Sequence, residues 1–142
     1  MGFKAIEITP LAQVSAITPP SKDVRVKAFS VARTDTTASV KAMLPFNSTI
    51  IDFLIFGAAS NAGTTATLSI GSSATSTEYV NAQDVKTAGG LIRPTSTVSA
   101  TNLPNLDPIP QSGDISIYAK YAESGTASSA GGPYTVIVFY VM

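Results

Sequence analysis

The stretch Tyr-Thr-Val-Ile-Val-Phe-Tyr-Val, residues 134–141, decides the fold class of this 142-residue chain. Successive residues of a β-strand point to opposite faces of the sheet, so this stretch predicts a strand with two distinct faces. One face carries Tyr134, Val136, Val138 and Tyr140, and the other carries Thr135, Ile137, Phe139 and Val141. Because both faces are largely apolar, we expect the strand to be buried on both sides or to lie at a subunit contact.

A second alternating segment precedes this strand. Its two faces carry Ile115, Ile117, Ala119 and Tyr121 on one side, and Ser116, Tyr118 and Lys120 on the other. The connection 122–133 is rich in Gly, Ser and Ala, which is typical of a long exposed loop. We therefore expect the two segments to pair as a C-terminal β-hairpin.

Two strands are expected near the start of the core. In residues 24–31 the apolar positions change from even to odd numbers, and one extra residue near Ala28, a β-bulge, would explain that change. After a turn at residues 34–36, the alternation of residues 38–42 predicts the next strand.

The middle of the chain contains a near-continuous apolar run. Residues 48–57 are rich in β-branched and aromatic side chains, which favours a central strand over a helix. Alternation over residues 65–70 predicts another strand, residues 79–87 have mild helical character, and the prolines of residues 101–112 predict an irregular loop. Together these segments predict an all-β, single-domain β-sandwich that is jelly-roll-like and low in helix.

The first twenty residues have a different pattern. Pro10 interrupts the segment and Pro19-Pro20 ends it, and its apolar side chains lie among polar ones without a regular period: Phe3, Ile6, Ile8, Leu11, Val14 and Ile17. We interpret residues 1–20 as an extended N-terminal arm that lies along a surface, with residues 21–142 forming the β-sandwich domain. The alternative is that the arm adds an edge strand to its own domain.

Composition excludes several classes of function. The chain has no His, no Cys and no Trp, and its nine Lys and Arg balance nine Asp and Glu. Catalysis by His or Cys and the usual zinc, haem or iron–sulfur sites are therefore excluded, and we expect neither an enzyme nor a cofactor. Zero net charge argues against nucleic-acid binding, no apolar run is long enough to cross a membrane, and residues 1–5 do not resemble a secretory signal. The polar surface instead depends on 17 serines and 17 threonines.

Acidic residues and glycines form no catalytic or metal-binding motif. The acids are scattered singly, and no glycine run has the spacing of a phosphate-binding loop. Asp52 interrupts the apolar run of residues 48–57. One interpretation is a buried functional acid; the other is an outward residue on a half-exposed face, or a pair with Lys41 or Arg93 across strands. We favour the second interpretation.

Tyrosines are the remaining candidates for contact with a partner. Tyr118, Tyr134 and Tyr140 lie on the C-terminal strands, where a row of tyrosines could stack on sugars. Cross-strand packing or a subunit interface, in which Tyr is enriched, is the better interpretation. These three residues and the six apolar residues of the arm are therefore the candidate partner contacts.

One region resembles a known family. LPFNSTIIDFLIFG (44–57), AASNAGTTATLSIG (58–71) and STEYVNAQDVK (76–86) are similar to a segment of small structural proteins of tailed bacteriophages. That segment has a Leu-Pro entry, a buried strand, a Gly/Asn/Thr loop, a strand ending in Gly, and a polar crossover. The resemblance covers residues 43–93 and points to head decoration (cement) and head-fibre proteins, which have no invariant active site.

The resemblance implies a structural protein of the virion. A decoration protein binds the outside of the assembled capsid at junctions between copies of the major capsid protein and stabilises their contacts. The resemblance also implies a homo-oligomer, with a trimer favoured over a dimer. This oligomer would be made in the host cytoplasm and located on the capsid exterior. The alternative is a tail or head-fibre module that binds host glycans through residues 72–76 and 124–132.

Overall fold

The computed structural model describes residue 2 and residues 23–94 and 113–142. This part of the chain contains no helix, so none is present that could span a membrane. Its eight strands are β1 (Val24–Val31), β2 (Ser39–Leu44), β3 (Thr49–Gly57), β4 (Thr65–Gly71), β5 (Val80–Asp84), β6 (Gly90–Ile92), β7 (Ile115–Ser124) and β8 (Tyr134–Val141). The expected contact residues of the arm and the expected loop at 101–112 lie outside the described residues.

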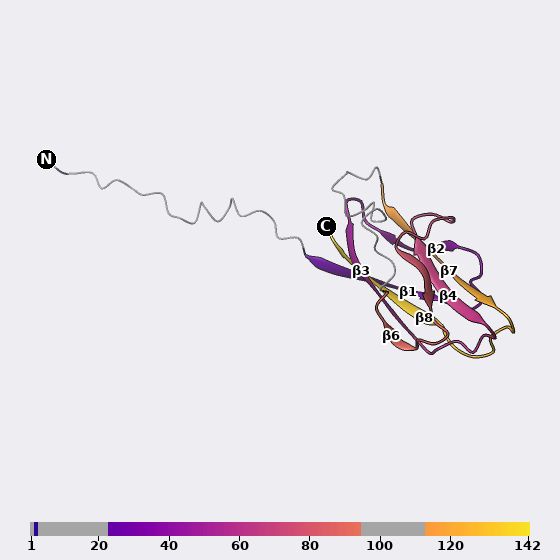
Figure 1. Ribbon diagram of the computed structural model, residues 1–142. Helices are drawn as coiled ribbons and strands as arrows, with labels where there is room; N and C mark the ends of the chain where they lie inside the picture. Colours follow the sequence, from indigo (N-terminus) through magenta and orange to yellow (C-terminus); the bar gives the residue numbers. More distant parts are fainter. Residues whose placement is uncertain (1, 3–22, 95–112) are drawn as a thin grey trace.

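Two antiparallel sheets of four strands pack face to face (Figure 1). The first sheet has the order β1-β8-β3-β6, and the second has the order β2-β7-β4-β5. The expectation of an all-β sandwich is confirmed. Strand β8 occupies an interior position in the first sheet, paired with β1 on one side and β3 on the other.

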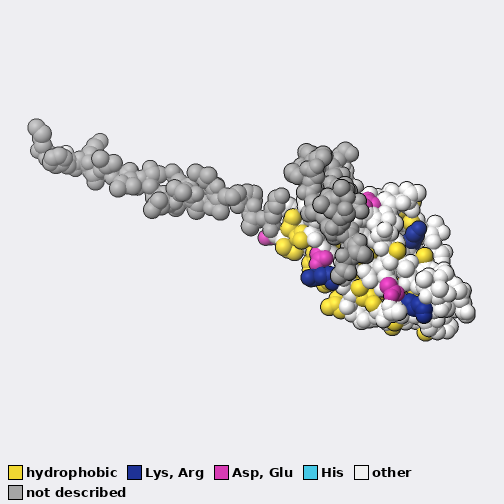
Figure 2. Space-filling model, viewed as in Figure 1, with side chains coloured by type: hydrophobic (Ala, Val, Ile, Leu, Met, Phe, Trp, Pro, Cys, Tyr) yellow, Lys and Arg dark blue, Asp and Glu magenta, His cyan; other side chains and the backbone are white. Residues whose placement is uncertain are grey.

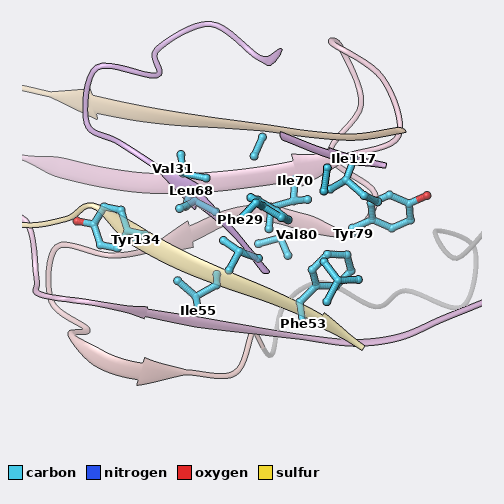
Figure 3. Packing of buried hydrophobic residues seen from close by; sticks show 14 of the residues in the cluster. Phe29, Val31, Phe53, Ile55, Leu68, Ile70, Tyr79, Val80, Ile117 and Tyr134 are labelled. Atoms are coloured by element: carbon cyan, nitrogen blue, oxygen red, sulfur yellow. The ribbon is translucent and has the colours of Figure 1, made fainter. Parts of the chain in front are cut away.

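The core lies between the sheets because the inward-facing residues of the central strands β3, β4, β7 and β8 are mostly apolar. Phe53, Ile55 and Tyr134 of the first sheet face Leu68 and Ile117 of the second, as Figure 3 shows. Alternation explains this arrangement, since the even-numbered residues of β8 are buried while the odd-numbered ones point outward. A buried surface of this kind needs no disulfide or metal for its stability.

The expected C-terminal hairpin is wrong. β7 pairs with β2 and β4 in the second sheet, whereas β8 pairs with β1 and β3 in the first. Each strand buries one apolar face, so β7 and β8 pack face to face across the core, and the long connection between them crosses from sheet to sheet. In the described chain, β4 and β5 are the one pair of consecutive strands that hydrogen-bond to each other.

The expected bulge near Ala28 is also wrong. β1 pairs with β8 in unbroken register from Val24 to Val31. The apolar residues change from even to odd positions because Val24 and Val26 lie on the outer face, whereas Phe29 and Val31 enter the core. Register shifts occur instead where β2 pairs with β7, where β3 pairs with β8 and where β4 pairs with β5.

The segment 79–87 forms a strand rather than a helix. β5 pairs with β4, and Tyr79, Val80 and Val85 are buried. The short strand β6, which the sequence did not indicate, extends the first sheet beside β3.

Candidate functional site

The outer face of the first sheet is apolar across its four strands. Cross-strand partners share a face, and the register aligns Val24 with Val141, Val26 with Phe139, and Phe56 with Leu91. We call this surface the outer apolar face. It consists of Val24, Val26, Ile51, Leu54, Phe56, Leu91, Ile137, Phe139 and Val141.

Five of these side chains are substantially exposed. The exposed fractions are 64% for Val24, 60% for Val26, 51% for Ile51, 37% for Phe56 and 60% for Leu91. The exposed surface of these five residues is nearly that of three fully exposed large side chains, or roughly 500 Å² of apolar surface. The largest patch on a typical monomer is about 300–600 Å², and the half-buried residues of β8 add to this one. Figure 2 shows hydrophobic side chains beside the start of β1 and toward β6, with acidic and basic side chains between the two groups.

One ion pair lies on this face. Arg93 Nε is 3.2 Å from Asp52 Oδ2, and Asp52 lies opposite Phe139 in the register. The interpretation of Asp52 as an outward residue paired with Arg93 is therefore confirmed. Lys41, the other partner considered, pairs with Asp35 at 2.8 Å.

A polar cluster lies where the β7–β8 connection crosses between the sheets. Glu123 Oε2 accepts hydrogen bonds from Tyr121 Oη at 2.7 Å and Ser128 Oγ at 2.5 Å. Tyr121 Oη is also 2.8 Å from Ser60 Oγ, and Arg33 donates to the Ser128 carbonyl. We call these five residues the Glu123 cluster. Since the carboxylate of Glu123 on β7 binds Ser128 within the connection, the cluster fixes the path of that loop.

Two ionisable groups near the crossing have shifted pKa values. Hydrogen bonds from Ser128 and then Tyr121 lower the pKa of Glu123 below its ordinary value of 4.5. Burial raises the pKa of Tyr134 above 10.0, and the nearby Tyr121 adds to that effect. Glu123 therefore stays ionised at neutral pH, and Tyr134 stays neutral.

An open pocket borders the Glu123 cluster. Arg33, Thr34, Glu123 and Ser128 supply its polar groups, and Gly131 and Pro133 supply part of its wall. Two loops, residues 72–76 and 124–132, were expected to bind glycans. The first loop follows the end of β4 at Gly71, and the second begins at Ser124, which pairs with Thr65 at the start of β4. The two loops therefore lie at opposite ends of the second sheet and do not form one site. No group of three or more metal-ligating side chains occurs in the described ranges.

The three candidate tyrosines occupy different environments. Tyr134 and Tyr140 are buried in the core of the protomer, and Tyr118 is half-buried on β7. Tyr134 stacks on Tyr121 within the same chain. The prediction that these tyrosines contact a partner is not tested by a single chain, and the same holds for the arm residues.

Sequence reasoning missed the residues of the outer apolar face outside β8. In β8 the signal is the apolar second face, which predicts burial on both sides or a subunit contact. Leu91 belongs to a strand of three residues, too short to show an alternating pattern. For Val24 and Val26, the change from even to odd apolar positions was attributed to a bulge and not to a change of face.

Comparison with known proteins identifies a shared fold. No protein-family model matches the sequence, and neither does any curated protein. A chain of the solved cyanophage Pam1 capsid asymmetric unit is similar in structure, with a TM-score of 0.62 and 21% sequence identity. The match covers 96% of this chain and 99% of that chain. The β-sandwich described above is thus a fold that also occurs in a chain of a phage capsid structure.

Proposed function

We propose that this chain is a structural protein of a bacteriophage virion, more specifically a decoration (cement) protein bound to the outside of the head. The observation that carries the proposal is the fold shared with a chain of the Pam1 capsid over nearly the full length of both chains. The phage-like segment at residues 43–93 supports the same assignment from the sequence. In the structure it contributes β3, β4, β5 and β6 to the two sheets.

Surface chemistry supports a role in contact rather than in catalysis. The outer apolar face offers area for protein contact, and the ionisable groups that lie near each other are held in ion pairs or hydrogen bonds. Such a protein stabilises a shell by contacting neighbouring coat subunits, so that separating those subunits also breaks the contacts of the bridging protein. Attachment of a homo-oligomer, which we propose to be a trimer, at several points multiplies modest individual contacts.

The arm at residues 1–20 is proposed to contact the major capsid protein. Its apolar side chains, from Phe3 to Ile17, have no regular strand period, and a surface-lying segment fits that pattern. Charged residues make up 13% of the chain, so few ion pairs are available for salt to screen. We therefore expect binding to persist to about 1 M salt.

The test uses heads of the encoding phage that lack this protein. Purified full-length chain is mixed with these heads and sedimented, and the pellet is imaged by electron microscopy. Regular density on the outer surface supports the proposal, whereas failure to sediment with the heads overturns it. A variant lacking residues 2–20, checked for folding by circular dichroism, separates the arm from the rest: unchanged binding would reject the arm as the contact.

A second candidate function is glycan binding by a tail or head-fibre module. The observation in its favour is the open pocket beside the Glu123 cluster, where a guanidinium, a carboxylate and a hydroxyl lie together. These groups already bind one another, which weakens this candidate. Binding of the isolated protein to a glycan array, lost in Arg33→Ala, would favour it over the decoration role.

A further inference from the structure

We propose that the outer apolar face of the first sheet is covered by other copies of this chain, so that Val24, Val26, Phe56, Leu91 and the odd-numbered residues of β8 form the subunit interface. This inference rests on the proposed homo-oligomer and names its contact surface. Because two copies of one face meet about a two-fold axis, it takes the dimer rather than the trimer as the basic unit. The starting observation is that an apolar surface runs across all four strands of the sheet.

The size of the face suits a stable interface between copies. Its five most exposed residues provide roughly 500 Å², and Leu54, Ile137, Phe139 and Val141 are partly exposed besides. A standard interface buries about 800 Å² on each partner. The apolar residues and the polar side chains between them together approach that area, and the largest apolar patch on a protomer is often a contact site.

The chemistry of the face suits a permanent contact with a copy of itself. Interfaces that form permanently between identical subunits are more apolar than those of partners that meet as separate soluble proteins. A coat protein on a finished shell meets the decoration protein as a separate partner, so their interface is expected to be the less apolar kind. The decoration protein must stay in solution until it meets the shell, which requires the face to be covered beforehand.

Charge and shape also favour an identical partner. When two copies of one face meet, unpaired charges of one sign repel each other, but here Asp52 and Arg93 neutralise each other within the protomer. Twisted sheets pack well on one another at a spacing of about 10 Å, with their strands at about 30°. The first sheet of another copy therefore has the shape needed to cover the first sheet of this one.

The sequence pattern of β8 agrees with this arrangement. Its inner face, from Tyr134 to Tyr140, is buried between the sheets of the protomer. Its outer face carries Ile137, Phe139 and Val141, which are half-buried in the isolated chain. Contact with another copy would bury this second face, which accounts for a strand that is apolar on both sides.

The test compares charged substitutions on the two sheets. Size-exclusion chromatography with light scattering should give the wild type a mass that is a multiple of 14.6 kDa. Val26→Lys combined with Leu91→Lys should weaken self-association at least tenfold, because it places lysines where the copies meet. The matched control is Val40→Lys with Met43→Lys on β2 of the second sheet, where the side chains are 46% and 52% exposed. The control should keep the wild-type mass.

A second measurement does not depend on disrupting the interface. Since the chain has no cysteine, a single Val26→Cys variant can form disulfides only between molecules. Under mild oxidation we expect cross-linked chains from Val26→Cys and at least tenfold fewer from Val40→Cys. A monomeric wild type, or an oligomer that survives both lysines and gives no cross-link at Val26, overturns the proposal. Loss of head binding with an unchanged oligomer would instead count against the decoration role alone.

Discussion

The ring of Tyr121 on β7 stacks on the ring of Tyr134 on β8, with centroids 6.1 Å apart and an angle of 16° between their planes. The two rings share one environment, but their hydroxyl groups differ. Tyr121 Oη is hydrogen-bonded to Glu123 and Ser60, whereas Tyr134 Oη is buried without a hydrogen-bond partner. Comparing variants of the two residues therefore separates the contribution of ring packing to stability from that of hydroxyl hydrogen bonding.

Removing each hydroxyl should have a different effect on stability. Tyr121→Phe should lower the free energy of unfolding by about 1–2 kcal/mol, because Ser60 and Glu123 each lose a hydrogen-bond partner. Tyr134→Phe should leave it unchanged or raise it, because an unpaired buried polar group is removed. Urea unfolding of both variants measures the difference. An equal loss in the two variants would contradict this account of the hydroxyl groups.

Glu123 should make the fold sensitive to acid. Its pKa is lowered in the folded state, so the unfolded chain binds the proton more readily. The stabilisation is complete above the ordinary value of 4.5 and is lost as the pH falls through the folded pKa. The Tm of the wild type should therefore drop as the pH falls below 4.5, and that of Glu123→Gln should drop less.

Other carboxylates contribute to the same acid response. Hydrogen bonds from Lys41 to Asp35 and from Thr87 to Asp84 lower the pKa of each acid, so Glu123→Gln should reduce the pH dependence without abolishing it. Asp23→Asn, at an exposed position, is the control and should follow the wild-type curve. A Glu123→Gln curve parallel to the wild type would show that the cluster adds nothing to acid stability.

Gly131 should not tolerate a side chain. Its φ is +100°, and an added Cβ would lie 2.6 Å from the Ser60 Cα. Gly131→Ala should therefore destabilise the protein by about 1–3 kcal/mol through backbone strain and steric clash. Gly113→Ala, where nothing lies within 4 Å of the new Cβ, is the matched control and should be neutral. Thermal unfolding distinguishes the two, and equal Tm values would refute the clash.

The ion pair on the outer apolar face should contribute little to the stability of the protomer. The Arg93 side chain is 69% exposed and that of Asp52 is 35% exposed, and solvent screens such pairs. Asp52→Asn should change the free energy of unfolding by less than about 1 kcal/mol, measured under conditions where the chain is monomeric. A loss several times larger would indicate that Asp52 acts as a buried acid rather than as a surface partner.

The strands themselves were predictable because their signal is local. Alternation identified β4, β7 and β8, and β-branched content identified β3, since each pattern needs only a few neighbouring residues. The pairing of the strands was not predictable in the same way. Whether β7 lies beside β8 or faces it across the core depends on contacts with β1, β2, β3 and β4, which no local pattern reports.

The candidate surfaces were predictable only in part. The two-faced pattern of β8 pointed to a contact surface, but the emphasis on Tyr134 and Tyr140 did not anticipate their burial in the core. A large ring at an inward position fills the interior, and that position depends on which face of the strand the opposite sheet covers. Asp52 was interpreted correctly because a charge within an apolar strand is stable mainly where it reaches solvent or a partner.

The place of β8 between β1 and β3 affects when the protein can fold during its synthesis. Val24, at the start of the described core, pairs with Val141 at its end, so the first sheet cannot close until residues 134–141 have left the ribosome. Until then β1 and β3 have open edges and apolar surface that other chains could bind. Pairing between such distant segments also predicts slow folding, on the millisecond-to-second scale. The newly made chains are thus most exposed to aggregation in the interval before residues 134–141 appear.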